Sequence, residues 1–394
     1  MPFKKIIFFA LLLLVRWGYS QIPELSARSQ ISVLTCGAGE DLYTTFGHSA
    51  FRVHDPSLGI DVVYNYGTFD FNPPMFYVDF ARGNMIYSLS RAHFDDFLFE
   101  YEMQNRWVKE QILDLTPKES NELFQFLETN YLPENRDYKY DFLFDNCATR
   151  ILAVLKKVYG EGLEFQDDYL DNQYTFRELI HQNLVANSWS SLGIDLALGS
   201  VIDKKATPYQ HAFLPNYVFK QLNNSFLDNY PLVQKEVVLL DSKPMNTGSN
   251  FLWTPLFWIL LLFVFVMLRT VLDFKNSVRS RRMDFFLFLI TGLVGLLIFF
   301  LWFFTNHSTT ANNFNILWAF PFNLVAAIYI FRKNILPLWM NYYLWGLLGL
   351  LGLTSVLWIF KIQIFSPLII PLLIVLAVRY VYLLKCPNRE SNMQ

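Results

Sequence analysis

Cysteine and histidine, the residues that build metal sites and disulfide frameworks, are scarce in this chain. Its 394 residues include three cysteines and six histidines. Only Cys36 and Cys147 precede the apolar C-terminal third, so a disulfide framework is excluded, which leaves either one bridge between them or two free thiols. The histidines are scattered, and no HExxH or CxxC motif occurs. We therefore predict neither a metal site nor a cofactor.

A surplus of positive charge is also lacking. The chain has 32 Lys and Arg against 34 Asp and Glu, interspersed, with a net charge of −2, which argues against a nucleic-acid partner. No internal repeat or low-complexity tract is present. The composition is 53% hydrophobic and 18% aromatic, too apolar for an ordinary soluble enzyme, yet charged residues are frequent in the first two thirds. These features predict two regions of different character.

Residues 1–20, MPFKKIIFFALLLLVRWGYS, have the pattern of a secretory signal peptide. Lys4 and Lys5 precede an apolar run of about ten residues, and small residues follow at Gly18 and Ser20. We expect cleavage before Gln21. The alternative is an uncleaved anchor, although Arg16 interrupts the apolar run. Either way, the region that follows is predicted to lie outside the cytoplasm.

The last third of the chain predicts a membrane domain. Apolar stretches of about the 20 residues that cross a bilayer occur at 251–272, 284–304, 314–331, 335–360 and 363–384. Basic residues lie between the first and second stretches, between the third and fourth, and after the fifth, whereas 305–313 has none. The positive-inside rule then places the preceding region outside, in the periplasm or its equivalent, and the C-terminus in the cytoplasm.

The domain boundaries follow from these features. Residues 21–245 are predicted to form one exported domain, since about 225 residues are ample for a separate core. The polar segment 241–250, with its Pro and Gly, reads as the linker into a membrane domain at 246–390.

The segment TTFGHSAFRVHDPSLGIDVVYNYG, residues 44–67, predicts a β-hairpin that presents a histidine. Alternating residues after His48, the turn DPSLG and the β-formers of 61–66 carry this prediction. With a turn centred near Ser57, His48 lies opposite Asn65 or Tyr66. A polar partner across from a strand histidine holds one tautomer, the orienting role in a catalytic triad, and the alternative is a capped, half-exposed histidine. Ser49 is a poor rival nucleophile because GHSAF lacks the second glycine of a nucleophile elbow.

The segment FDNCATRILAVLKKVYG, residues 144–160, predicts an amphipathic helix that begins at Cys147. Asp145 and Asn146 are good N-cap residues, and Ile151, Leu152, Leu155 and Val158 form an apolar stripe. The free N–H groups of a helix start lower a thiol pKa and can hold an oxyanion. The alternative is a cysteine that packs as a small hydrophobe. That simpler interpretation is the one we favour for Cys36, at a strand end near a turn.

Taken together, these motifs resemble a known family. A strand histidine, a polar residue on the neighbouring strand and an N-C pair that opens a helix resemble the permuted papain-like fold of NlpC-type and lecithin:retinol acyltransferase-like enzymes, an α+β fold. More narrowly, LTCGAGEDLYTTFGHSAFRV, FDNCATR and five C-terminal spans together resemble the Lnb family of bacterial lipoprotein N-acyltransferases. The resemblance covers nearly the whole chain after the signal segment.

This resemblance implies a reaction and its residues. An acyl chain would pass from a phospholipid donor, through a thioester on Cys147, to the α-amino group of a diacylglyceryl-cysteine lipoprotein. His48 would be the base, and we predict Asn65 as the third catalytic residue, with Tyr64 and Tyr66 as rivals. For substrate binding we predict Tyr64, Tyr66, Asn146 and His307.

Other interpretations remain open at this point. A membrane-anchored NlpC-type cysteine peptidase or amidase acting on cell-wall peptides would use the same thiol and imidazole, as would a phospholipase, and a membrane receptor would need neither. Residues 206–219, rich in aromatics and prolines, predict either ordinary helical packing or a lid or lipid-facing collar. His307 lies in the charge-free loop 305–313, where it either faces the active site from below or is simply solvated.

Overall fold

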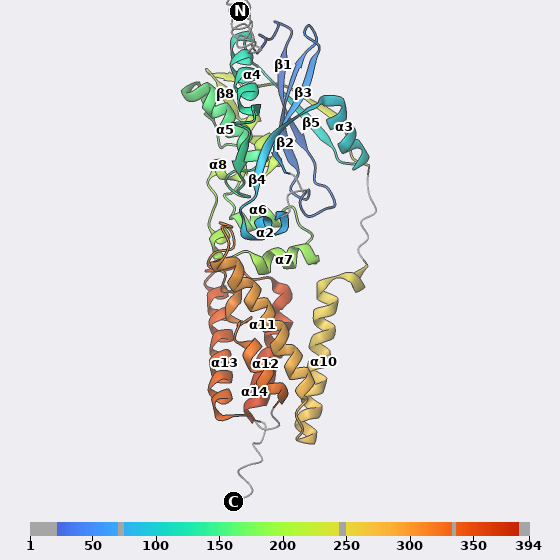
Figure 1. Cartoon of the computed structure of the whole chain (residues 1–394), viewed down its shortest axis with the longest axis vertical. Coiled ribbons are helices and arrows are strands. Elements are labelled where there is room, and N and C mark those ends of the chain that lie inside the picture. The colour runs from blue at the N-terminus through green and yellow to red at the C-terminus, as the bar shows by residue number, and fades with distance from the viewer. Residues whose placement is uncertain (1–21, 70–74, 244–249, 333–335, 386–394) are drawn as a thin grey trace, which may run out of the picture.

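The computed structural model of this chain describes residues 22–69, 75–243, 250–332 and 336–385, so the predicted signal segment lies outside the described residues. An α/β domain, here called the exported domain (22–243), stands on one end of a helical membrane domain (250–385), as Figure 1 shows. The predicted fold class, an α+β domain followed by a helical membrane region, is confirmed at this level.

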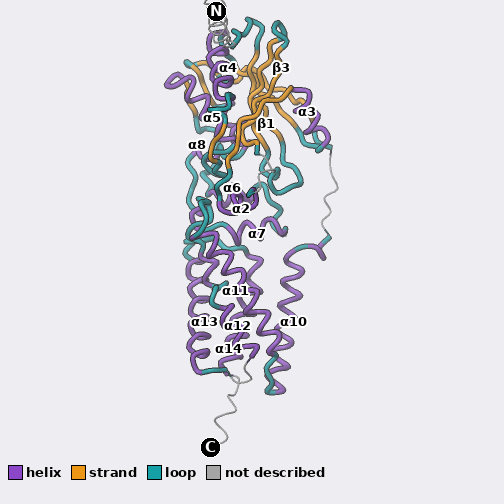
Figure 2. The backbone as a smooth tube through the Cα atoms, in the orientation of Figure 1, coloured by secondary structure: helices purple, strands orange, loops and turns teal. Residues whose placement is uncertain are grey.

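A seven-stranded antiparallel sheet organises the exported domain (Figure 2). Its strand order is β10-β5-β1-β2-β3-β4-β6. Apolar β-branched and aromatic residues fill the central strands, and their side chains are almost completely buried. The bounds are β1 Gln30–Cys36, β2 His48–Asp55, β3 Ile60–Thr68, β4 Ile86–His93, β5 Val108–Leu113, β6 Asp137–Lys139 and β10 Val233–Leu240.

Helices cover both faces of this sheet. The apolar stripe of α5 (Cys147–Tyr159) packs with α4 (Pro117–Tyr131) and α9 (Pro215–Asn223) on the main core. Ile151, Leu152 and Leu155 are each 0% exposed, and burying such a side chain stabilises the fold by about 1.5–3 kcal/mol. α3 (Phe94–Met103) packs on the other face. The sheet therefore fixes the position of the helix that begins at Cys147.

The remaining elements connect this core to the membrane domain. They comprise a three-stranded sheet of β7 Leu163–Phe165, β8 Ser225–Leu227 and β9 Tyr230–Pro231, and the helices α2 Phe76–Arg82, α6 Phe176–His181, α7 Trp189–Ala197 and α8 Pro208–His211. Residues 206–219 include α8 and most of α9, and Phe213, Leu214 and Val218 are buried in the cores. Of the two interpretations of this segment, the structure supports ordinary helical packing.

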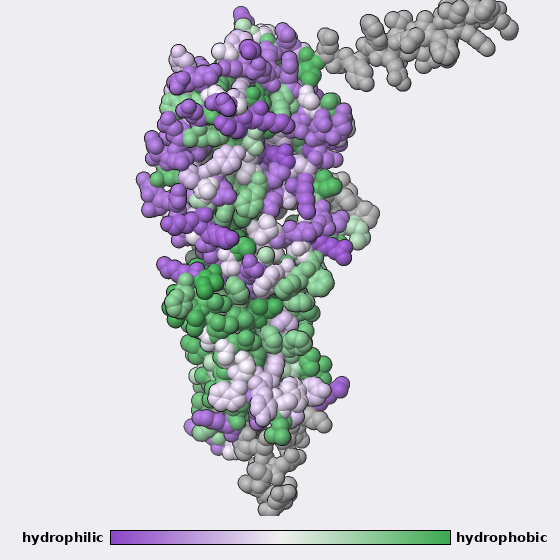
Figure 3. Space-filling view, turned by 90° about the vertical axis from the view of Figure 1, so that its left-hand side faces the viewer, coloured by the Kyte–Doolittle hydropathy of each residue, from purple (hydrophilic) through white to green (hydrophobic). Residues whose placement is uncertain are grey.

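Within the described ranges, four helices are long and apolar enough to cross a membrane. They are α10 Pro255–Asn276, α11 Arg281–Phe303, α13 Leu338–Ile359 and the continuous helical segment Pro367–Lys385, which contains α14 Ile370–Lys385. Their outer surface is strongly hydrophobic, whereas the exported domain is mostly hydrophilic (Figure 3). This contrast supports the predicted division of the chain.

The third predicted span, 314–331, is not one long helix. It begins with a 3₁₀ turn, η4 (Phe314–Leu317), and continues as α12 (Asn323–Arg332), whose ten residues extend only about 15 Å. Pro321 interrupts the pattern, and two glycines of α11 admit the non-helical backbone, since a Cβ on Gly295 would lie 1.9 Å from the Ala319 carbonyl oxygen. Non-helical backbone at membrane depth needs such protein surroundings.

This broken segment still runs between the two sides of the membrane domain. At its start the Phe314 N–H donates to Gln363 Oε1 at 2.8 Å, between α13 and α14 on the side of the exported domain. Near its end the Ile330 carbonyl accepts a 2.8 Å hydrogen bond from Arg279, which lies between α10 and α11 on the far side. Four of the five predicted spans are therefore helices long and apolar enough to cross a membrane, and the prediction of a fifth such helix at 314–331 is wrong, because this segment is a 3₁₀ turn followed by a ten-residue helix.

Candidate functional site

The β2–β3 hairpin carries the predicted histidine, with a register one residue away from the expected one. Asp55 pairs with Ile60 and Phe51 with Tyr64, so the turn is centred between Ser57 and Leu58. Continued to the start of β2, this register places His48 opposite Gly67 rather than Asn65 or Tyr66. Asn65 is then the diagonal neighbour, and its Oδ1 lies 3.2 Å from His48 Nε2.

The two tyrosines beside Asn65 point away from the histidine. Tyr64 donates to Glu128, and Tyr66 Oη donates to Asn130 Oδ1 at 2.5 Å, both on α4. Their exposed fractions are 0% and 1%. The structure therefore places both tyrosines, predicted to bind substrate or orient His48, in the core, because alternation along the strand directs them there. Asn65 is the neighbour that contacts the imidazole.

Cys147 is the first residue of α5, as the sequence predicts. Asn146 caps the helix: its Oδ1 accepts from the N–H groups of Ala148 and Thr149, and its Nδ2 donates to the Phe142 and Phe213 carbonyls at 2.7 and 2.9 Å. The Asn146 side chain is 3% exposed and fully engaged. Its predicted role in substrate binding is wrong, and it instead fixes the helix start that holds the thiol.

The half-buried thiol of Cys147 lies beside His48, close enough for each group to shift the pKa of the other. Burial by itself raises the pKa of Cys147, but the charge of His48, its hydrogen bond and the backbone N–H groups of Ser49 and Ala148 outweigh burial and hold the pKa below its ordinary value. In the same way, burial lowers the pKa of His48, yet its contacts with Cys147 and Asn65 bring the net pKa above its ordinary value. Opposite shifts of this kind favour a thiolate–imidazolium pair.

Comparison with protein families identifies both parts of the chain. Residues 22–182 match the Lnb N-terminal periplasmic domain, and residues 246–390 match the Lnb transmembrane domain. The chain is a membrane protein of the Lnb family. Its α/β domain is therefore the periplasmic domain of that family, and this contact of thiol, imidazole and amide lies within it. No curated protein and no solved structure matches the chain in the corresponding comparisons.

The other cysteine of the Lnb periplasmic domain, Cys36, does not have the environment of a nucleophile. Cys36 ends β1 and is 1% exposed, and both cysteines are free thiols, so the alternative of a bridge is excluded. Burial raises the pKa of Cys36 to about 12, which keeps the thiol protonated. Ser49, the rival nucleophile, is also buried, and its contribution to the site is its backbone N–H.

His307 belongs to a contact between the two Lnb domains. Its Nε2 lies 3.0 Å from the carbonyl oxygen of Phe80 in α2, and the neighbouring Asn306 N–H donates to the Arg82 carbonyl at 2.7 Å. Gly83, at φ +69°, ends α2 where a Cβ would meet His307 N at 2.9 Å. His307 therefore holds α2 against the membrane domain, and no hydrogen bond among the described residues links it to Cys147.

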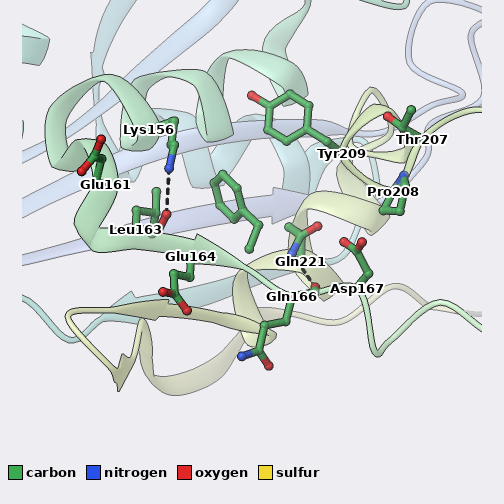
Figure 4. A pocket seen from close by; sticks show the side chains of 11 residues that line it. Lys156, Glu161, Leu163, Glu164, Gln166, Asp167, Thr207, Pro208, Tyr209 and Gln221 are labelled. Carbon is green, nitrogen blue, oxygen red and sulfur yellow. Dashed lines mark hydrogen bonds between the residues drawn. The ribbon is translucent and has the colours of Figure 1, made fainter.

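A pocket elsewhere in the periplasmic domain is separate from this site. It lies beside the C-terminal part of α5, between β7 and α8, and is lined by Lys156, Glu164, Tyr209 and Gln221 (Figure 4). Lys156 is bound to the Leu163 carbonyl at 2.9 Å, and Gln221 to that of Gln166 at 2.9 Å. Nine residues of helix, about 13 Å along its axis, separate Lys156 from Cys147, so this pocket does not serve the thiol.

Gly67 is a site residue that the motif argument missed. At φ +90° it lies in the irregular end of β3, and a Cβ there would be 3.4 Å from the Cys147 Cβ. The absence of a side chain opposite His48 leaves room for the cysteine. The signal was present in YNYG, where a glycine ends a strand of β-formers.

Proposed function

We propose that this Lnb-family protein is a lipoprotein N-acyltransferase that uses Cys147 as nucleophile and His48 as base. The observation that carries the proposal is that Cys147, at the start of α5, meets the end of the β2–β3 hairpin, where His48 Nε2 lies 3.2 Å from Asn65 Oδ1. Ser308, in the loop after α11, donates to Asp141 at 2.7 Å, only six residues before Cys147 in the chain. A reactive thiol at this level suits substrates whose scissile groups lie at the membrane surface.

In the first half-reaction the thiolate of Cys147 attacks the ester carbonyl of a phospholipid. A C–S bond forms, and the carbonyl electron pair moves onto oxygen. When the tetrahedral intermediate collapses, the C–O bond of the ester breaks, and the leaving alkoxide takes the proton held by His48. The products are a lysophospholipid and an acyl thioester on Cys147. Asn65 keeps the imidazole in the orientation that delivers the proton.

In the second half-reaction the free α-amino group of a diacylglyceryl-cysteine lipoprotein attacks the thioester. His48 accepts a proton from the attacking nitrogen, the C–S bond breaks, and the thiolate–imidazolium pair is restored. The net change is transfer of one acyl group from oxygen to nitrogen, with no cofactor. The protein acts as a transferase rather than a lipase only if the amine attacks the thioester faster than water does.

The membrane domain anchors the proposed catalytic domain next to both substrates. Both substrates are anchored in one leaflet, so a catalytic domain fixed above that leaflet meets them at a high effective concentration. We place the protein in the bacterial inner membrane with its C-terminus in the cytoplasm, as the distribution of basic residues favours. A cell-wall peptidase with the same thiol needs no polytopic anchor, which is why we prefer the lipid reaction.

Replacement of Cys147 tests the proposal. We expect cells whose only N-acyltransferase is the Cys147→Ala variant to make lipoproteins that lack the N-acyl chain, as read by mass spectrometry of their N-terminal peptides. Cys36→Ala is the matched control, and it should leave N-acylation intact because that thiol is buried and protonated. Unchanged N-acylation in the Cys147 variant would refute the proposal. Altered peptidoglycan fragments would instead indicate a peptidase, and lysophospholipid with free fatty acid but no acylated lipoprotein would indicate a phospholipase.

A further inference from the structure

The hydroxyl of Tyr138 is an unexplained polar group beside the nucleophile. Tyr138 lies in β6, nine residues before Cys147, and its Oη is shielded from solvent with no hydrogen-bond partner among the described residues. An unsatisfied buried hydroxyl costs about 1–3 kcal/mol. Such groups are rare in folded proteins, so this one requires a physical explanation.

The missing side chain of Gly67 defines a small space next to this hydroxyl. The position that a Cβ of Gly67 would occupy is 3.9 Å from Tyr138 Oη, 3.9 Å from the Cys147 backbone nitrogen and 3.4 Å from the Cys147 Cβ. An O–H donor and an N–H donor therefore border the same space beside the thiol. The Asn146 cap engages the N–H groups of Ala148 and Thr149, not that of Cys147.

Neighbouring residues hold the Tyr138 ring in place. The Arg150 guanidinium carbon lies 4.0 Å from the ring centroid, and Arg150 Nη2 is itself held by Asp145 at 2.7 Å. Tyr66 packs edge-on against the same ring with centroids 6.2 Å apart. Burial, and then the charge of Cys147, raise the pKa of Tyr138, so its hydroxyl keeps the proton that it would donate.

We propose that the Tyr138 hydroxyl and the backbone N–H of Cys147 form the oxyanion hole of this site. As the Cys147 sulfur bonds to an acyl carbon, the carbonyl π electrons move to oxygen, and that oxygen receives two hydrogen bonds in the space beside Gly67. When the intermediate collapses, the electron pair returns to re-form the carbonyl and the leaving group departs. This inference rests on the proposed function only in taking Cys147 as an acyl-accepting nucleophile.

The test compares Tyr138→Phe with wild type in the full-length protein in detergent. With p-nitrophenyl butyrate as acyl donor, we expect kcat/KM for acylation of Cys147 to fall by about 10²–10³-fold, the usual loss of one oxyanion-hole donor. Alkylation of Cys147 by iodoacetamide forms no oxyanion, so its rate and pH profile should be unchanged. Tyr159→Phe is the matched control: its hydroxyl donates to the Glu119 carbonyl at the far end of α5, and both rates should stay near wild type.

The two rates decide the inference. Because Tyr138 Oη has no partner, Tyr138→Phe breaks no hydrogen bond among the described residues, and the thermal midpoint should not fall. Equal losses of acylation and alkylation, or a lowered midpoint, would show a structural role and overturn the proposal, as would an unchanged acylation rate. The small ester also separates this inference from the proposed function: a wild-type protein that is acylated by the ester but never N-acylates a lipoprotein refutes only the latter.

Discussion

At the scale of single residues, the reactivity of Cys147 depends on His48 more than on the helix start. The charge and hydrogen bond of His48 are the largest influences that lower the thiol pKa, ahead of the N–H groups of Ser49 and Ala148. Burial acts in the opposite direction, and it persists when the imidazole is removed. The imidazole is therefore what holds the pKa of this half-buried thiol below its ordinary value.

Removing the imidazole should move the pH profile of the thiol upward. Because the folded pKa of Cys147 lies below its ordinary value, the wild-type thiolate is lost only as the pH falls through that lowered pKa. In His48→Ala burial still raises the pKa of Cys147, and the charge of His48 no longer opposes it. We therefore expect the pH of half-maximal alkylation by iodoacetamide to shift upward. The shift is measured by quenching the iodoacetamide reaction at fixed times over a range of pH and quantifying alkylated Cys147 by mass spectrometry. Asn65→Ala keeps the imidazole and should give a smaller shift in the same direction.

A profile that is unchanged in His48→Ala would mean that the helix start alone activates the thiol. The window for acyl transfer follows from the same shifts. It opens above the lowered pKa of Cys147 and closes above the raised pKa of His48, where the imidazolium loses the proton needed by the leaving group.

The sequence could predict these two residues because each is marked by a local rule. An N-cap asparagine before an amphipathic helix places Cys147, and a strand start places His48. The third residue depended on hairpin register. The turn is centred between Ser57 and Leu58 rather than near Ser57, which moves the pairing by one residue, and Asn65 reaches His48 only as its diagonal neighbour. For Gly67 the sequence signals only that a glycine ends a strand, and for Tyr138 it signals nothing. Their importance arises from a meeting of β6, β3 and α5 that no sequence spacing indicates.

At the scale of elements, hydropathy located the membrane segments but not their form. The stretch 314–331 is apolar enough to suggest a span, yet Asn315, Pro321 and Asn323 divide it. The Asn323 amide bonds Thr291 of α11 at 2.9 Å, and Tyr343 of α13 donates to Asn323 at 2.5 Å. Side-chain hydrogen bonds therefore connect the broken segment to the neighbouring helices, and averaged hydropathy is insensitive to them.

A buried charge cluster joins α10 to the other membrane helices. Arg379 of α14 is 0% exposed, and it binds Asp284 of α11 at 2.5 Å, Asp273 of α10 at 2.8 Å and Thr270 of α10 at 3.2 Å. One guanidinium thus connects three helices near the side away from the periplasmic domain. Such a cluster is sensitive to the loss of one partner, because the remaining charges stay buried without compensation.

We expect Arg379→Met to destabilise the protein by about 3–5 kcal/mol, seen as a large fall in the thermal midpoint in detergent. Adding Asp284→Asn should restore part of the loss, since one uncompensated carboxylate is then removed. Arg269→Met is the control: Arg269 lies 3.8 Å from Asp273 with its side chain 46% exposed, and an exposed pair contributes about 1 kcal/mol or less. Equal effects of the two arginine substitutions would contradict a special role for the cluster.

At the scale of the whole molecule, the loop 304–313 fixes the periplasmic domain above the membrane domain. The Thr309 and Asn312 carbonyls accept from Gly199 and Ser200 at 3.0 Å each. Gly199 makes this contact feasible, because a Cβ there would lie 1.9 Å from the Ala311 carbonyl oxygen. Together with the contacts of Asn306 and His307 to α2, these bonds connect the loop to two segments of the periplasmic domain and hold that domain in place against the membrane domain.

Asn313 is the centre of this connection. Its side chain is 0% exposed: Nδ2 donates to the Leu196 and Ala197 carbonyls at the end of α7, at 2.8 and 3.0 Å, and Oδ1 accepts from the Asn315 backbone and from Gln363. Truncating this side chain leaves several buried groups unpaired at the domain junction. The consequence should be a periplasmic domain that is intact but poorly positioned.

We therefore expect Asn313→Ala to separate two activities that wild type combines. Acylation of Cys147 by soluble p-nitrophenyl butyrate should stay within about twofold of wild type, because the thiol and imidazole lie in the periplasmic domain alone. Acylation from phospholipid in vesicles should fall about 10-fold or more, since one buried hydrogen-bonded side chain is worth more than about 1 kcal/mol. Asn312→Gly is the matched control, because Asn312 has φ +53° and contributes its carbonyl, which glycine preserves. If Asn313→Ala lowered the acylation rates from p-nitrophenyl butyrate and from phospholipid by the same factor, the loop would support the fold of the periplasmic domain rather than its position above the membrane.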